Sequence, residues 1–220
     1  MKLLNIMNLR HLFNIVLVCT LLCACDKEDN INFPITLYAH EVSRTSDIRL
    51  FINKKEIYDT NVIRDFVGDS EYFKLPTNKD VQLSNEGIYF LSKDSVLFGT
   101  LTTGFTVRKN ATQFLFYSPK MVQVKDGDMV RPLLKYTDEL IPVSPMTGYN
   151  YITSEVRVGY GLYKNLELSF LSYMRLRKTA YGESFNAGIL LNEFNEESIN
   201  TLQLGDTLAI REYRVRFIAK

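Results

Sequence analysis

Cysteine is scarce in this sequence, and its three occurrences, Cys19, Cys23 and Cys25, all lie within the first 25 residues. The chain beyond Cys25 therefore has no disulfide, no thiol nucleophile and no cysteine-based metal site. Its stability must come from the burial of a hydrophobic core, for which a chain of this length has enough surface.

Histidine is almost as rare, because the sequence contains only His11 and His40. A Ser-His-acid triad in the main part of the chain would have to use His40, and no Gly-x-Ser-x-Gly motif occurs. There is also no His-Glu-x-x-His motif, and Asp126-Gly127-Asp128 lacks the later glutamate of a calcium loop, so it reads as a turn. We therefore expect no metal, no cofactor and no catalytic residue, and we class the chain as a non-enzyme.

Paired carboxylates are the remaining catalytic chemistry that needs no histidine. Glu193, Glu196 and Glu197 are candidates, but they lie in a charged stretch that we interpret as a solvated turn. A carboxylate-based hydrolase is therefore the least favoured reading.

Charge of one sign is not in excess either. The first 24 residues contain Lys2 and Arg10 and no acid, so of 26 basic residues 24 remain in the rest of the chain, against 25 acidic ones. This balance argues against nucleic-acid binding, which requires a clustered basic surface.

The first 24 residues have the pattern of an export signal. A basic, acid-free start is followed by an apolar run from Ile15 to Ala24, and the sequence then becomes abruptly polar. A membrane anchor that stays in place is the other reading, but the run is shorter than the roughly 20 residues that a spanning helix needs. We expect a signal peptide over residues 1–24 that is cleaved between Ala24 and Cys25.

The residues around that point, Leu22-Cys23-Ala24-Cys25, resemble the lipobox of bacterial lipoproteins. The resemblance implies that Cys25 carries a diacylglycerol thioether and, after cleavage, an acylated amine. Two or more acyl chains anchor a protein stably, whereas one gives only marginal membrane binding. The implied partner is thus the membrane, through the lipid on Cys25.

The charged residues that follow, Asp26, Lys27, Glu28 and Asp29, resemble the export tag of Bacteroidota surface lipoproteins. The resemblance implies an outer-membrane, cell-surface location. A solvated tether on the periplasmic face is the alternative. We assign residues 25–33 to a lipidated tether and residues 34–220 to a single β-rich domain.

The rest of the chain favours an all-β fold, because it is dense in β-branched and aromatic residues. From Val81 to Thr137, short strand-like runs recur between turn residues, which predicts an antiparallel meander closed as a β-barrel or stacked as a β-sandwich. A lipocalin-like barrel is one form that such a meander allows, although no lipocalin fingerprint is present. Longer runs, in which we expect one buried and one solvated face, follow at Glu155–Leu162, Leu166–Met174 and Ala209–Ala219.

Two short helices are expected. Asp59 can cap a helix over Thr60–Val67, with Val62, Ile63 and Phe66 facing inward. One helical turn is expected over Asn195–Asn200. The proline-rich stretch from Thr137 to Gly148 is predicted to be a loop and is a candidate mouth or lid.

Tyrosines cluster where this loop meets the next strands, at Tyr149, Tyr151, Tyr160 and Tyr163. If exposed, they could stack on a sugar or an apolar ligand, and otherwise they pack across the sheet. The absence of tryptophan weakens the case for a glycan platform. Separately, Asp94-Ser95-Val96 and Asp206-Thr207-Leu208 resemble the Bacteroidota O-glycosylation pattern, which makes Ser95 and Thr207 weak candidate sites.

Two functions remain open from the sequence. The first is a non-catalytic surface module that binds a glycan, a peptide or a small apolar ligand, which predicts a concave pocket. The second is a structural or assembly lipoprotein that docks on an outer-membrane partner or adhesin, which predicts an exposed apolar patch or an open sheet edge.

Overall fold

The computed structural model describes residues 31–83, 87–99, 103–179 and 182–220. The chain divides into two compact units, residues 1–32 and 33–220, and the fold described below is that of the second unit. The predicted signal peptide, Cys25 and the charged tag Asp26–Asp29 lie outside the described residues, so their roles stay predictions.

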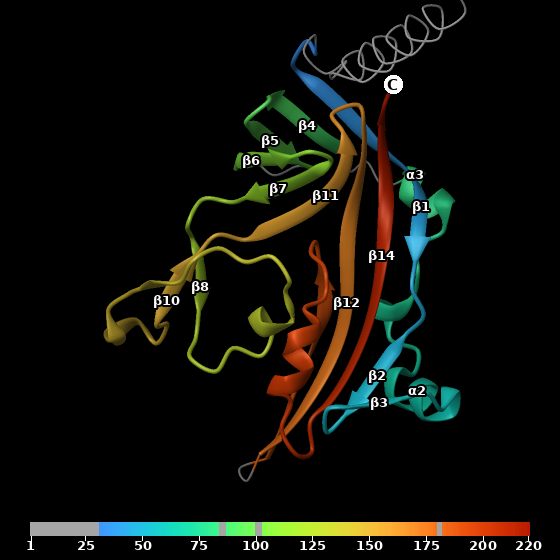
Figure 1. Ribbon diagram of the computed structural model, residues 1–220, viewed down its shortest axis with the longest axis vertical. Coiled ribbons are helices and arrows are strands. Elements are labelled where there is room, and N and C mark those ends of the chain that lie inside the picture. The colour runs from blue at the N-terminus through green and yellow to red at the C-terminus, as the bar shows by residue number, and fades with distance from the viewer. Residues whose placement is uncertain (1–30, 84–86, 100–102, 180–181) are drawn as a thin grey trace, which may run out of the picture. The chain divides into compact units, whose positions relative to one another are not determined.

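Eight antiparallel strands form a closed barrel (Figure 1). They follow one another around the ring in chain order, and β14 closes it by pairing with both β12 and β1. The strands are β1 (Ile35–Thr45), β4 (Gly87–Ser92), β5 (Ser95–Phe98), β6 (Phe105–Asn110), β7 (Gln113–Tyr117), β11 (Val156–Leu162), β12 (Asn165–Thr179) and β14 (Thr207–Ala219). The expected all-β meander is confirmed, and of the two closures considered, the barrel is the one observed. Its expected start is wrong, because Val81–Leu83 belong to a helix, α3 (Asn78–Leu83), and not to a strand.

The same eleven-stranded sheet continues beyond the barrel, because β12 and β14 extend past the strands that close it. β12 and β14 run side by side from the pair Asn165–Ile218 to the pair Leu176–Thr207 (Figure 1). Beyond the barrel, β12 pairs with β13 (Gly182–Leu190), and β14 pairs with β2 (Arg49–Ile52), which in turn pairs with β3 (Lys55–Ile57). We call this part of the sheet, β13-β12-β14-β2-β3, the extension.

The other elements are insertions between consecutive barrel strands. The first insertion, between β1 and β4, holds β2, β3, α2 (Thr60–Val67), η1 (Glu71–Phe73) and α3 (Asn78–Leu83). The second, between β7 and β11, holds β8 (Val122–Val124), η2 (Arg131–Leu133), β9 (Ile141–Pro142), η3 (Pro145–Thr147) and β10 (Tyr151–Thr153). The third, between β12 and β14, holds β13 and η4 (Glu196–Thr201).

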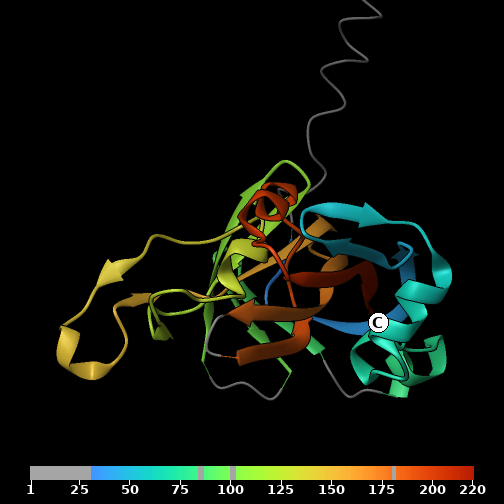
Figure 2. The ribbon, with the colours of Figure 1, turned by 90° about the horizontal axis from the view of Figure 1, so that it is seen from below.

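The predicted mouth or lid belongs to the second insertion. Within Thr137–Gly148, β9 pairs with β10, and β10 also pairs with β8, so the stretch is part of a small three-stranded sheet. Figure 2 shows this yellow part of the chain projecting away from the barrel.

Aromatic side chains fill the barrel. Phe90 contacts Phe114, Phe116 and Tyr163 at ring-centroid distances of 6.0, 6.2 and 5.1 Å, and all four side chains are buried. Each buried ring of this kind stabilises the fold by roughly 1.5–3 kcal/mol relative to exposure. The barrel interior is therefore a packed core.

The extension is covered on both faces. One hydrophobic cluster includes Leu171 and Tyr173 and packs under η2 and η4. The other includes Met174 and Ala209 and packs against residues of α2 and η1. The expectation of one dry and one wet face is therefore wrong for the middle of β12, where Leu171–Arg175 are all buried. Alternation is seen nearer the barrel, where Leu166 and Leu168 are buried and Glu167 between them is partly exposed.

Both expected helices are present. Asp59 caps α2 by accepting a hydrogen bond from the Asn61 amide at 2.9 Å, and α2 has the bounds that the sequence predicted. Ile63 and Phe66 pack against the core as expected, but Val62 is 39% exposed, because Val67 rather than Val62 completes the buried face. η4 follows Asn195, whose side chain accepts from the Glu197 amide.

Candidate functional site

The predicted tyrosine cluster does not assemble. Tyr163 is buried inside the barrel, where its ring packs edge-on against Phe114 and its hydroxyl donates to the Lys93 carbonyl at 3.1 Å. It therefore cannot stack on a ligand at the surface. Tyr151 lies in β10 of the small sheet of the second insertion. Tyr149 lies in the loop before β10, where the Lys125 ammonium is 5.1 Å from its ring.

Tyr160 is the exception, because it lies beside a cluster of charged residues on the outside of the barrel. The Arg214 guanidinium sits 4.2 Å from the centre of its ring. Its hydroxyl is 3.4 Å from that of Tyr136 and accepts a hydrogen bond from Gln113 Nε2 at 3.3 Å. Burial and the contact with Tyr136 raise the pKa of Tyr160, so the phenol stays protonated.

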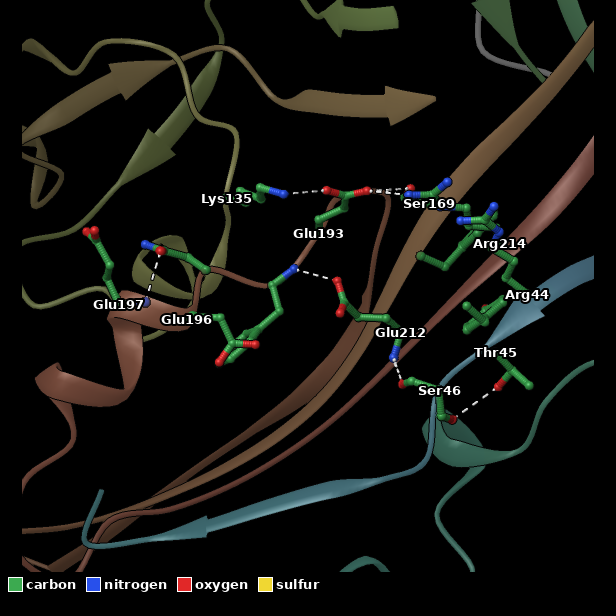
Figure 3. A pocket seen from close by; sticks show the side chains of 14 residues that line it. Arg44, Thr45, Ser46, Lys135, Ser169, Glu193, Glu196, Glu197, Glu212 and Arg214 are labelled. Carbon is green, nitrogen blue, oxygen red and sulfur yellow. Dashed lines mark hydrogen bonds and ion pairs between the residues drawn. The ribbon is translucent and has the colours of Figure 1, made fainter. Parts of the chain in front are cut away.

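The charged cluster is centred on Glu193, which is buried. One carboxylate oxygen accepts from Lys135 Nζ at 3.0 Å, and the other accepts from Arg214 Nη2 at 2.9 Å and from Ser169 Oγ at 3.3 Å (Figure 3). Burial alone would raise the pKa of Glu193, but its hydrogen bonds from Lys135 and Tyr160 and the nearby positive charges outweigh it. The pKa therefore lies below its usual value, and Glu193 is a carboxylate rather than a general acid.

Asn192 holds this glutamate in place. Its amide nitrogen donates to the Tyr136 and Val156 carbonyls, each at 2.8 Å, and its amide oxygen accepts from the Tyr136 and Glu193 backbone amides. These bonds use both donors and both acceptor positions of a buried side chain. They fix the third insertion against the second and against β11.

A cavity of about 580 Å³ opens beside Glu193, where the barrel wall meets the extension. We call it the junction cavity. Figure 3 shows side chains reaching it from the end of β1, from β12 and β14, from Lys135 in the second insertion, and from Glu193 and the start of η4. Its charged lining residues are Arg44, Lys135, Glu193, Glu196, Glu197, Glu212 and Arg214.

Some of these charges are already paired. Glu193 is bound by Lys135 and Arg214, and Glu196 accepts from Arg49 at 2.5 Å, the same guanidinium that binds Glu56 at 2.7 Å. Interpreting residues 193–197 as a solvated turn was thus wrong for Glu193. It was right for Glu196, whose side chain is 61% exposed, and for Glu197, which is also exposed.

Arg44 is different, because within the described part of the chain no carboxylate pairs with it. It is exposed and lies directly opposite Arg214 in the register of β1 and β14. Like charges at such a position destabilise a sheet unless an anion compensates them. Arg214 has such compensation from Glu193 and Glu167, at 2.9 and 3.9 Å. The guanidinium of Arg44 is therefore free to bind an anion from solution.

Two carboxylates of the cavity also lack an ion pair among the residues that the structure describes. Glu212 accepts a hydrogen bond from the Phe194 amide at 2.9 Å. Glu197 is exposed and lies at the left of Figure 3, whereas Arg44 lies at the right. Phe170 is also among the lining residues, and its half-buried ring stacks on Tyr213 at 5.0 Å. The cavity thus offers a cation and carboxylates, which can bind a polar ligand.

No group of three histidine, cysteine, aspartate or glutamate residues in the described ranges has the geometry to hold a metal ion. His40 lies away from Glu193, in β1, and lines a different cavity with Tyr38 and Lys220. Over the same ranges, no helix has the length and apolar character of a membrane-spanning segment.

The two candidate glycosylation tripeptides differ in their surroundings. Ser95 begins β5 next to Asp94, at the exposed turn of a hairpin. Thr207 lies in the middle of the extension, paired with Ile52 on one side and Leu176 on the other, and Asp206 beside it is completely buried. In the folded protein, only the Asp94-Ser95 pair presents an exposed acid.

Sequence reasoning missed the junction cavity because its parts come from all three insertions. Glu193 is 58 residues from Lys135 and 21 from Arg214, so no local motif joins them. The one available signal was a glutamate in a stretch with asparagine on both sides, which could only have been read as a turn. No protein-family model, curated protein or solved structure is significantly similar to this chain.

Proposed function

We propose that this chain is a lipoprotein anchored through Cys25 to the outer membrane and displayed at the cell surface, where it binds a ligand without catalysis. The proposed location and lipid anchor are supported by the first 29 residues, which hold the signal pattern, the lipobox resemblance and the charged tag. The binding role rests on the junction cavity. Neither role needs a cofactor.

The observation that carries the binding role is the guanidinium of Arg44, which no carboxylate of the described ranges pairs with and which lines a cavity of about 580 Å³. A guanidinium binds a carboxylate with two parallel hydrogen bonds, which gives both strength and orientation. Glu197 and Glu212 can accept hydrogen bonds from hydroxyl or amine groups. The ligand class that fits is a carboxylate-bearing glycan or peptide.

The test compares binding of purified protein to an array of acidic glycans and peptides. Arg44→Ala should lower affinity for the bound ligand at least tenfold, and Arg44→Lys should lower it less, because a lysine keeps the charge without the two-pronged geometry. Arg64→Ala is the matched control, since Arg64 is an exposed arginine on α2 outside the junction cavity. Equal binding by the Arg44→Ala and Arg64→Ala variants would contradict the assignment.

The anchor is tested separately. Cells fed an alkyne fatty acid should label the full chain but not a Cys25→Ala variant, and Cys19→Ala should label normally because Cys19 lies inside the signal. Protease added to intact cells should digest the protein. Protection in intact cells with digestion after lysis would place it on the periplasmic face.

A structural lipoprotein that docks on an outer-membrane partner is the second candidate. The observation that favours it is an open strand edge at β13, at one end of the sheet order. Crosslinking of that strand to a different protein in intact cells would support this function over ligand binding.

A further inference from the structure

β13 is an edge strand. It pairs with β12 along its whole length, from Gly182–Thr179 to Leu190–Leu171, and it stands at one end of the eleven-stranded sheet. Among the described strands, none pairs with its other side. A row of backbone amide and carbonyl groups on that side is thus available to another strand.

Natural proteins protect such edges with lysine, proline, bulges or short strands, and β13 has none of these. Its sequence is Gly-Glu-Ser-Phe-Asn-Ala-Gly-Ile-Leu, and its register with β12 is continuous. Its one charged residue, Glu183, is paired with Lys178 on the neighbouring strand at 3.0 Å. Two of its large apolar side chains face solvent, Phe185 at 60% exposure and Ile189 at 40%.

The two faces of β13 have different surroundings. Phe185, Ala187 and Ile189 share the face of Met174, which pairs with Ala187, and Ala187 packs against the core cluster there. Asn186 points to the opposite face, where its side-chain oxygen accepts from the Tyr173 hydroxyl at 2.6 Å. The exposed apolar stripe therefore borders a core that is already formed.

We propose that β13 pairs with β13 of a second copy of this chain, antiparallel about a twofold axis at Asn186. In this register Phe185 lies opposite Ala187 of the partner, so a large side chain meets a small one twice, and Ser184 lies opposite Gly188. Glu183 lies opposite Ile189, so the two copies of the only charged residue are at opposite ends. A twofold axis requires such self-complementarity, and an unrelated partner does not.

This pairing makes the extension continuous across both copies. It covers Phe185 and Ile189 on one face and satisfies the open backbone groups. It is independent of the lipid anchor and of the ligand proposed for the junction cavity, which is lined by residues of neither β13 nor its turn.

The absence of cysteine beyond Cys25 gives a direct test. Single cysteines are placed in turn at Ser184, Phe185, Asn186, Ala187 and Gly188 of the full chain, and whole cells that produce each variant are oxidised with copper-phenanthroline. Directly opposed residues of antiparallel strands have Cα atoms about 4.5–5.5 Å apart, within the range of a disulfide. Only the residue on the axis meets its own copy there, so Asn186→Cys should give the largest homodimer yield, at least tenfold above the unsubstituted chain.

A second variant distinguishes specific pairing of two β13 strands from disulfides that form by random collision of two chains. Adding Phe185→Lys to Asn186→Cys places a charge on the edge and should lower the disulfide yield at least tenfold. Adding Tyr58→Lys, at a tyrosine that is 80% exposed in the first insertion, should not change it. Thermal melting of each variant checks that the fold is retained.

The proposal is overturned by a yield from Asn186→Cys no higher than that of the unsubstituted chain, or by a maximum at another of the five positions. It is overturned equally if Phe185→Lys and Tyr58→Lys have the same effect, or if the cysteine crosslinks only to a different protein.

Discussion

Arg175 and Asp206 form an ion pair in which neither side chain reaches solvent, with Arg175 Nη2 3.1 Å from Asp206 Oδ2. The pair links β12 to the residue before β14. Arg175 also donates to the Met129 carbonyl at 2.9 Å, and the same carboxylate oxygen accepts from the Gln203 amide at 3.1 Å. The interaction thus ties the second and third insertions to the extension.

Removing one member of this ion pair should strongly lower the free energy of unfolding. Asp206→Ala leaves the guanidinium of Arg175 buried without its counter-ion, which typically costs about 3–5 kcal/mol of unfolding free energy. Urea unfolding followed by circular dichroism measures the loss. Glu183→Ala removes an exposed pair with Lys178 and should cost less than about 1 kcal/mol. Similar losses for the two variants would contradict the role given to Asp206.

The cluster at Glu193 should make stability depend on pH. The folded-state pKa of Glu193 is lowered, so its contribution is present above the unfolded pKa of about 4.3 and is lost as the pH falls through the folded value. Glu193→Gln should therefore destabilise the protein by about 2 kcal/mol at pH 7, where a charged hydrogen-bonded partner is lost.

The difference in stability between the unsubstituted protein and Glu193→Gln should become smaller as the pH falls below the folded-state pKa of Glu193. Thermal melting of both from pH 7 to pH 3 checks the direction. Glu197→Gln, at an exposed glutamate four residues away, should leave the profile of the unsubstituted protein unchanged. A difference between Glu193→Gln and the unsubstituted protein that grows toward low pH would refute the assignment.

Gly161 should not tolerate a side chain. Its φ is +129°, and a Cβ atom built there would lie 2.3 Å from the Asn165 carbonyl oxygen. This backbone cannot give way easily, because it forms the β11–β12 hairpin in which Gly161 pairs with Leu166. Gly161→Ala should thus destabilise the protein by more than about 2 kcal/mol. Ala substitution at Gly127, where a Cβ atom meets nothing within 4 Å, isolates the cost of positive φ from that of the clash.

The C-terminal strand should be indispensable. A chain that ends after Gly205 lacks β14, and β12, β1 and β2 then lose a shared neighbour. The barrel cannot close, and the extension splits between β12 and β2. We expect such a chain to be insoluble or unfolded by circular dichroism, and a soluble chain with a sharp melting transition would show this expectation to be wrong.

Local pattern was enough to predict the barrel strands from β4 onward and α2, whereas no strand was predicted over β1. Alternating apolar residues and turn signals mark the meander, and Asp59 before Thr60 marks the start of a helix, since both signals depend on neighbours in sequence. β13 escaped prediction because Gly182, Ser184, Asn186 and Gly188 interrupt its apolar residues. It is a strand because β12 supplies a partner along its whole length.

The junction cavity could not be predicted from the sequence for a related reason. Its ion pairs join residues of separate insertions, so they depend on how those insertions pack on the barrel. The four tyrosines between residues 149 and 163 are close in sequence. The turn after β11 nevertheless directs Tyr163 into the barrel, while Tyr160 stays outside. Closeness along the chain did not predict closeness in space.

β12 and β14 each belong to the barrel and to the extension. Two hydrophobic cores that share a pair of strands cannot melt one after the other, because separating those strands destroys both at once. The barrel and the extension should therefore unfold cooperatively although they have separate cores. Heating should give a single calorimetric transition whose enthalpy reflects both cores together. Sequence change is most easily accommodated in the insertions, while the length of these two strands is fixed by the barrel and the extension together.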